Sequence, residues 1–305
     1  MRLAQLIVFG ITTGLIYALV GLGWGVIYNM TGVLNVAQGE FVMLGGVGSA
    51  FFSQTLDVSL PTAGILALAM VLVVALAIEF LAIVVVRGRS RVAPVLMTLA
   101  SVFVISDVAR RVFGSDAFAG APLLTGPPIM VPGVDVSVPR RVLPIWLLAI
   151  AMFAAYAIFN KTRLGKLMRA ASEDPRGARL MGVNTAAMAR TAFLIAGFVG
   201  AVAGFFLLTV IPLGFGSGLA LGVKGFIALA LAGMSRPLGA LGGGLALGIT
   251  ESLVAGYLSS QYAEVVAYVV LITVLLFSPT GLMSLRLSLP SGRRRVATAT
   301  IPRGG

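Results

Sequence analysis

The sequence predicts an all-α membrane protein, a polytopic bundle of transmembrane helices. Of its 305 residues, 59% are hydrophobic and only 10% are charged, and the mean hydropathy is +1.05. Soluble domains carry about 25% charged residues, and a soluble surface needs more charge than this chain has. The apolar residues also gather in runs of about 20, the length that spans a bilayer.

Seven apolar runs are clear, and two more are less regular. The clear runs cover residues 6–28, 61–86, 92–109, 142–159, 187–211, 238–256 and 264–280. Residues 36–56 begin with polar side chains, and residues 221–234 are short and contain a lysine. Both are predicted as broken or re-entrant helices, since irregular backbone is tolerated at membrane depth only where protein or a cavity covers it. We therefore expect about eight or nine spans in a transmembrane domain over residues 1–285.

Basic residues predict the orientation of these spans. If the loop after residues 61–86 is cytoplasmic, alternation places 16 of the 22 Lys and Arg residues on the cytoplasmic side. Residues 160–186 then form the longest cytoplasmic loop, and the Pro- and Gly-rich residues 112–141 form an extended cap on the outer face. Residues 286–305 are predicted as a basic, disordered cytoplasmic tail. The N-terminus lies outside with nine spans and inside with eight.

Composition excludes several kinds of chemistry. The chain has no His and no Cys, so it lacks the residues for usual zinc sites, Cys nucleophiles and Ser-His-Asp triads. It also lacks a G-x-x-x-x-G-K-[ST] loop for nucleotide phosphates, so a partner must bind any ATP that is used. We expect no metal and no cofactor on this chain. The net charge of +12 lies in short clusters between apolar runs, which suits an anionic lipid surface and not nucleic acid.

Ionisable residues within apolar runs are costly and are therefore candidates for function. They are Glu40, Glu79, Asp107, Lys224 and Glu251. Lys224 and Glu251 lie on consecutive predicted helices, where an ion pair would offset the burial cost of each. Alternatively, the long side chain of Lys224 reaches the outer interface. Asp107 precedes two arginines by three and four residues, the spacing of a local ion pair on one helix face.

A second polar group lies at the start of the irregular segment 36–56. Asn35, Gln38 and Glu40 bring three polar side chains into six residues beside an apolar run. One interpretation is a loop and helix start, with Asn35 as the helix cap and Glu40 favoured by the helix dipole. The other is a segment that lines a pathway or contacts a partner. The residues alone favour neither.

The residue pattern of the predicted cytoplasmic loop 160–186 indicates a short amphipathic helix that is tethered between two spans. Ser172 is placed to cap it, Pro175 lies in its first turn, and Gly182 ends it. The alternative is a solvated basic loop. A helix held at both ends is better suited than a free tail to pass a push from a soluble partner into the membrane. The residues assigned to this coupling role are Ser172, Glu173, Asp174, Pro175, Ala178 and Gly182.

These segments together resemble a known family. Residues 31–45, TGVLNVAQGEFVMLG, resemble the G-x-x-N-x-A-[HQ]-G-E-x-x-x-x-G signature of ABC importer permeases of the branched-chain amino acid class. Residues 171–184 are similar to the coupling loop of that family, where the ATPase docks. Further similarity covers residues 222–226, 239–243, 248–252 and 278–282. The chain is closer to the shorter, LivH-like subunit, although Gln38 stands where many members have His.

The resemblance implies a transport subunit, not an enzyme. The chain would be one half of a heterodimeric pore in the bacterial inner (plasma) membrane, beside a LivM-like second permease subunit. Cytoplasmic ATPase subunits would use ATP, and a periplasmic binding protein would deliver branched-chain or other amino acids. The candidates for the translocation pathway are Asn35, Gln38, Glu40, Lys224 and Glu251. Permeases of the same class for urea or short amides are one alternative, and an ion-coupled secondary transporter that works alone is another.

Overall fold

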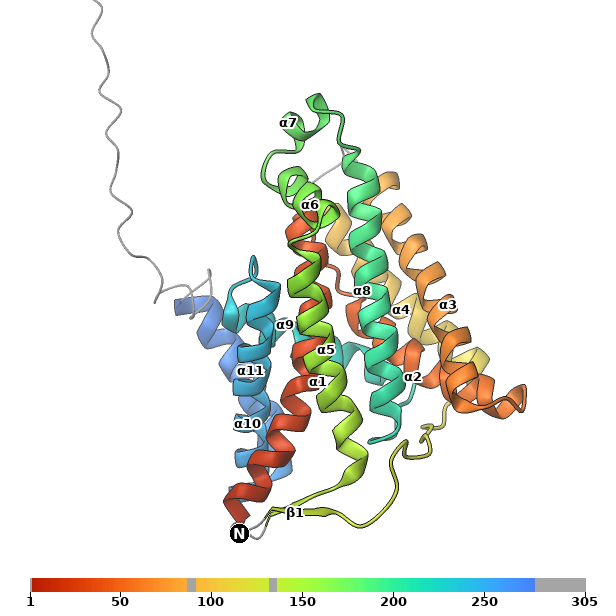
Figure 1. Ribbon diagram of the computed structural model, residues 1–305, viewed down its shortest axis with the longest axis vertical. Helices are drawn as coiled ribbons and strands as arrows, with labels where there is room; N and C mark the ends of the chain where they lie inside the picture. Colours follow the sequence, from red (N-terminus) through yellow and green to blue (C-terminus); the bar gives the residue numbers. More distant parts are fainter. Residues whose placement is uncertain (1, 87–91, 132–135, 278–305) are drawn as a thin grey trace, which may run out of the picture.

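The computed structural model describes residues 2–86, 92–131 and 136–277 (Figure 1). Its long helices stand side by side as one bundle. A two-stranded hairpin lies at one end of the bundle, and two short helices, α6 and α7, lie at the other. We call these the hairpin end and the basic end. The predicted tail 286–305 and the family-like residues 278–282 lie outside the described residues.

Nine helices of the described chain form the bundle. They are α1 (Arg2–Thr31), α2 (Gln38–Thr55), α3 (Leu60–Glu79), α4 (Ala93–Phe113), α5 (Leu143–Phe159), α8 (Thr185–Leu208), α9 (Ser217–Ala232), α10 (Ala240–Tyr257) and α11 (Ser260–Phe277). A π-helical segment, Phe80–Val85, continues α3, and 3₁₀ segments at Arg140–Val142 and Pro237–Gly239 precede α5 and α10. The connections contain β1 (Ile129–Val131), β2 (Val136–Val138), α6 (Arg163–Glu173) and α7 (Pro175–Leu180).

The predicted membrane-spanning helical bundle is confirmed. By length and composition, 6 helices in the described ranges are long and apolar enough to cross a membrane, and α9 is a shorter apolar helix of 16 residues. The helices α2 and α11, of 18 residues each, complete the set. The start of α1 lies at the hairpin end, opposite α6 and α7 (Figure 1). The start of α1 therefore lies at the opposite end of the bundle from the loop 160–186, which the sequence predicts to be cytoplasmic (Figure 1).

Glycines bring α1 and α10 into backbone contact. A Cβ on Gly10 would lie 2.6 Å from Ile249 Cα, and a Cβ on Gly14 would lie 2.7 Å from the Gly244 carbonyl oxygen. Small residues at such positions let membrane helices approach closely. At the hairpin end, the Ser252 hydroxyl donates a hydrogen bond of 2.6 Å to the Leu6 carbonyl. The end of α10 therefore lies beside the start of α1, and the two helices are antiparallel.

Residues 112–141, the predicted outer loop, contain a hairpin that the sequence analysis does not predict. Strands β1 and β2 pair antiparallel, with Ile129 opposite Val138. The side chain of Gln5 on α1 donates to the Ser137 carbonyl at 2.9 Å and accepts from the Ser137 amide at 3.2 Å. These bonds hold the hairpin against the start of α1.

Candidate functional site

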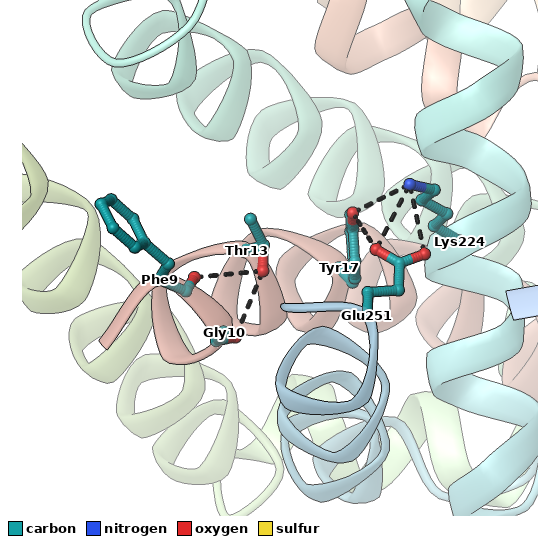
Figure 2. Close-up of polar contacts among 6 residues, drawn as sticks. All are labelled: Phe9, Gly10, Thr13, Tyr17, Lys224 and Glu251. Atoms are coloured by element: carbon teal, nitrogen blue, oxygen red, sulfur yellow. Dashed lines mark hydrogen bonds and ion pairs between the residues drawn. The ribbon is translucent and has the colours of Figure 1, made fainter. Parts of the chain in front are cut away.

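An ion pair with a hydroxyl partner joins α1, α9 and α10 (Figure 2). Lys224 Nζ lies 3.2 Å from Glu251 Oε1 and 3.3 Å from Glu251 Oε2. The Tyr17 hydroxyl donates to Glu251 Oε2 at 2.7 Å and accepts from Lys224 Nζ at 3.1 Å. Of the two alternatives for Lys224, the structure supports the pair with Glu251. We call Tyr17, Lys224 and Glu251 the triad.

The triad lies deep in the bundle. The Tyr17 backbone is about 20 Å from either end of α1, at 1.5 Å per residue, whereas Glu251 lies on α10 nearer the hairpin end, between Ile249, which packs against Gly10, and Ser252, which bonds to Leu6. The side chains of Tyr17 and Glu251 are both buried. Lys224 keeps 22% of its side chain exposed. An ammonium group has three N–H donors, and three oxygens of the other two residues lie within reach. One turn earlier on α1, the Thr13 hydroxyl bonds back to the carbonyls of Phe9 and Gly10 (Figure 2).

The polar residues at the start of α2 are fully buried. Asn35, Gln38 and Glu40, which we call the polar start of α2, each have 0% exposure. Gln38 Nε2 donates to the Ala196 carbonyl on α8 at 3.1 Å. The Ser106 hydroxyl on α4 donates to Glu40 Oε2 at 3.3 Å. Both polar side-chain atoms of Asn35, and one oxygen each of Gln38 and Glu40, have no hydrogen-bond partner in the described chain.

The interpretation of Asn35 as a helix cap is wrong. The N-cap position of α2 is Ala37, and no side chain caps the helix. Instead, the backbone carbonyl of Asn35 accepts from the Gln38 amide at 3.1 Å, so the chain turns tightly before α2. Glu40 does lie in the first turn of α2, as predicted. Its carboxylate lies directly against Gly218, the second residue of α9, where any Cβ would clash with it.

A mostly apolar groove lies beside the polar start of α2. Its volume is about 220 Å³, and the residues Leu34 and Val36 form one wall. Trp24 and Gly222 also line it, and the Trp24 indole donates to the Gly222 carbonyl on α9 at 3.1 Å. The remaining lining comes from Leu219, Val223 and Phe226. Asn35 lies between Leu34 and Val36 in the sequence, but none of the three polar residues lines the groove itself. Unpaired buried polar atoms cost about 1–3 kcal/mol each, so the polar start of α2 and the neighbouring groove are a candidate site for a solute.

The sequence predicts one short helix in residues 160–186, and the structure has two, α6 and α7. Asp174 caps α7, because its Oδ1 accepts from the amides of Arg176 at 3.1 Å and Gly177 at 3.0 Å. The prediction of Ser172 as the cap is wrong. Ser172 lies inside α6, where its hydroxyl bonds back to the Arg169 carbonyl. Pro175 is the first residue of α7, as predicted.

Gly182 ends α7 with a left-handed backbone, φ +81°. Its amide donates to the Arg179 carbonyl at 3.0 Å, and the Val183 amide donates to the Ala178 carbonyl at 2.9 Å. This is the Schellman pattern of helix termination, and it agrees with the predicted end of the helix. Ala178 is buried, whereas Leu180 and Met181 expose 88% and 85% of their surface. Glu173 and Asp174 are also exposed.

The remaining ionisable groups form ion pairs near the two ends of the bundle. Asp107 pairs with Arg110 at 3.0 Å and with Arg111 at 2.7 Å, as the spacing predicts. Glu79 is buried and lies 3.6 Å from Arg190 Nε on α8. No sequence pattern predicts this second pair, because its members come from helices far apart in the chain.

A bundle of membrane-length helices that buries charged and polar groups at depth is typical of a multi-pass membrane transport protein. A family model described as "Branched-chain amino acid transport system / permease component" matches residues 6–275. The chain therefore belongs to this family, and it is a transport permease component.

Relatives are similar over most of the chain. The permease protein LivH of the high-affinity branched-chain amino acid transport system of Escherichia coli (strain K12) is 31% identical over 289 residues, which cover 90% of this chain and 93% of LivH. BraD of Pseudomonas aeruginosa, from a system of the same description, is 31% identical over 293 residues, 92% and 95% of the two chains. The guanosine ABC transporter permease protein NupQ of Bacillus subtilis (strain 168) is 28% identical over 272 residues, 83% and 84%. No solved structure matches. The predicted family is confirmed.

Proposed function

We propose that this chain is the LivH-like permease subunit of an ATP-driven ABC importer of amino acids in the bacterial inner membrane. The basic end faces the cytoplasm, where ATPase subunits bind ATP and dock. A LivM-like permease subunit completes the pore. A periplasmic binding protein delivers the solute to the hairpin end. The chain itself binds no cofactor.

The observation that carries this proposal is the α6–α7 pair. These helices lie beyond the long helices at the basic end (Figure 1) and are tethered on both sides, by α5 and α8. Buried Met168 and Ala178 anchor them to the bundle, while Leu180 and Met181 stay uncovered. Adjacent exposed apolar side chains on helices that are anchored to the bundle suit a contact with a soluble partner. The two tethers would transmit movement of that partner to α5 and α8.

Charge supports the orientation. The α6–α7 segment and its flanks hold seven basic residues, which are Lys161, Arg163, Lys166, Arg169, Arg176, Arg179 and Arg190. Cytoplasmic loops of membrane proteins are enriched in Lys and Arg. The described loops at the hairpin end carry fewer basic residues.

Amino acids are the solute class that the relatives favour. LivH and BraD are named for branched-chain amino acids and NupQ for guanosine, and the first two match at higher identity and coverage. An apolar groove next to unpaired polar atoms also suits a small solute with a polar head and an apolar side chain. A thermal-shift screen of the cognate binding protein tests the class. Stabilisation by leucine, isoleucine or valine supports it, and stabilisation only by guanosine, urea or short amides contradicts it.

Docking at α6–α7 is tested with cysteine cross-linking, because the chain has no native cysteine. We expect Leu180→Cys and Met181→Cys to cross-link to the ATPase subunit in membranes. Gly182→Arg, which places a side chain at a left-handed φ, should abolish uptake while the two permease subunits remain assembled. Charge reversal at Glu173 and Asp174 should do the same. Unchanged uptake in these variants contradicts docking there, and uptake without an ATPase would indicate a secondary transporter.

A further inference from the structure

A cavity at the basic end of the described residues lies outside the proposed pathway. Its volume is about 1050 Å³, at the upper end of the usual range for small-molecule pockets, which is about 300–1,000 Å³. The ends of α1 and α5, one face of α6 and the segment between α9 and α10 enclose it. Neither the triad nor the polar start of α2 lines it.

Two arginines from separate elements line this cavity. Arg169 comes from α6, and Arg236 comes from the segment before α10. Both are exposed, and neither makes an ion pair within the described chain. Glu173 also lines the cavity one turn after Arg169, and no ion pair joins the two. Asn160 and Ser235 add neutral hydrogen-bonding groups.

Guanidinium groups bind phosphate through paired hydrogen bonds. A cavity lined by two guanidinium groups outside any ion pair and by neutral hydrogen-bonding side chains therefore suits a phosphate group. Its position adds a second argument, because basic pockets between helices at the cytoplasmic surface bind acidic lipid headgroups.

The rest of the lining is apolar. Met30, Phe159 and Leu238 contribute walls that a free phosphate ion would not use. The volume also exceeds what a single phosphate fills. Both features fit a phosphate that carries an apolar extension.

We propose that this cavity binds the headgroup of an acidic phospholipid, with the phosphate between Arg169 and Arg236 and the glycerol and upper acyl carbons against Met30, Phe159 and Leu238. The bound lipid would connect α6 to the α9–α10 segment. This inference rests on the proposed cytoplasmic orientation of the basic end and is independent of the transported solute.

The test compares lipid binding by the assembled transporter in the wild-type form and as the double variant Arg169→Gln with Arg236→Gln. Arg163→Gln is the matched control, because Arg163 lies on the same helix, is exposed and does not line the cavity. Native mass spectrometry measures retained phosphatidylglycerol against phosphatidylcholine, and thermal unfolding measures stabilisation by each lipid. A third arm adds inorganic phosphate without lipid.

We expect the wild type and Arg163→Gln to retain phosphatidylglycerol selectively. The double variant should lose about tenfold or more in apparent affinity, because it removes the charge-assisted hydrogen bonds of both guanidinium groups to the phosphate. In phosphatidylcholine alone, all three proteins should unfold at the same temperature, which shows that the double variant is folded. Equal phosphatidylglycerol retention by all three proteins would overturn the site. Stabilisation by inorganic phosphate equal to that by the lipid would overturn the lipid assignment.

Discussion

The triad and the polar start of α2 are both buried among the helices, but they differ in how their polar atoms are satisfied. In the triad, the Lys224 ammonium contacts both oxygens of Glu251 and the Tyr17 hydroxyl. In the polar start of α2, the Glu40 carboxylate has one hydroxyl donor, from Ser106, and no cation within ion-pair distance in the described residues. Neither polar atom of the Asn35 side chain has a hydrogen-bond partner in the described residues.

This difference indicates different roles. A paired set of charges at depth fixes the helices that carry it, because separating the pair leaves a buried charge uncompensated. Buried polar groups without partners are exceptions in native proteins, and we infer that these groups gain partners when the surrounding helices move or a solute binds. We therefore assign the triad mainly to the scaffold that joins α1, α9 and α10. The polar start of α2 is the stronger candidate for the translocation pathway, whose surroundings change during transport.

The largest expected effect follows from breaking the triad. Glu251→Gln leaves the Lys224 ammonium at membrane depth without its counter-charge, and we expect a loss of about 3 kcal/mol or more in unfolding free energy. Thermal unfolding in detergent measures this loss. The double variant Lys224→Leu with Glu251→Leu removes both charges and should recover most of the stability. No recovery in the double variant would contradict pairing as the cause.

A substitution in the polar start of α2 should lower the transport rate without lowering the unfolding temperature. Glu40→Gln keeps the shape of the side chain and removes a buried charge that has no cation beside it. We expect uptake to fall about tenfold or more, the scale of one hydrogen bond to a charged group. The unfolding temperature should stay the same or rise, because a desolvated charge is lost. Wild-type uptake in this variant would contradict a pathway role for Glu40.

The smallest effect is expected at the exposed ion pair of α4. Asp107→Asn removes contacts to Arg110 and Arg111, but the three side chains are about half exposed or more. Solvent and salt screen such pairs, so they contribute little. Uptake and unfolding temperature should equal those of the wild type within measurement error. A clear loss of either would show that charge at this position has a role that the geometry does not reveal.

Much of the bundle is predictable because long apolar runs carry their own signal. The run 142–159 corresponds to α5 at Leu143–Phe159, and the irregular segments correspond to α2 and α9, the first of which begins inside buried protein. The hairpin was missed, because strands of three residues in a Pro- and Gly-rich loop give almost no periodic pattern.

Contacts in the sites are predictable where the two residues lie on one helix or on consecutive helices, because their spacing then indicates that they can meet. The pair Lys224–Glu251 was one of two open alternatives, whereas its hydroxyl partner Tyr17 lies 207 residues before the lysine. A tyrosine in an apolar run is usually a core residue, so no sequence pattern identifies Tyr17 as a partner of this ion pair. The cap was predicted at Ser172 and lies at Asp174, because α6 extends to Glu173 and the next helix starts only after it.

The most direct test compares the accessibility of two serines, each next to one of the two buried sets. Ser106 bonds to Glu40, and Ser252 follows Glu251 on α10. In the otherwise cysteine-free chain, Ser106→Cys and Ser252→Cys are labelled with a small water-soluble thiol reagent, with and without ATP turnover by the assembled transporter. We predict that labelling of Ser106→Cys changes with turnover and that labelling of Ser252→Cys does not. Turnover-dependent labelling at residue 252 with none at residue 106 would contradict the assignment of pathway and scaffold.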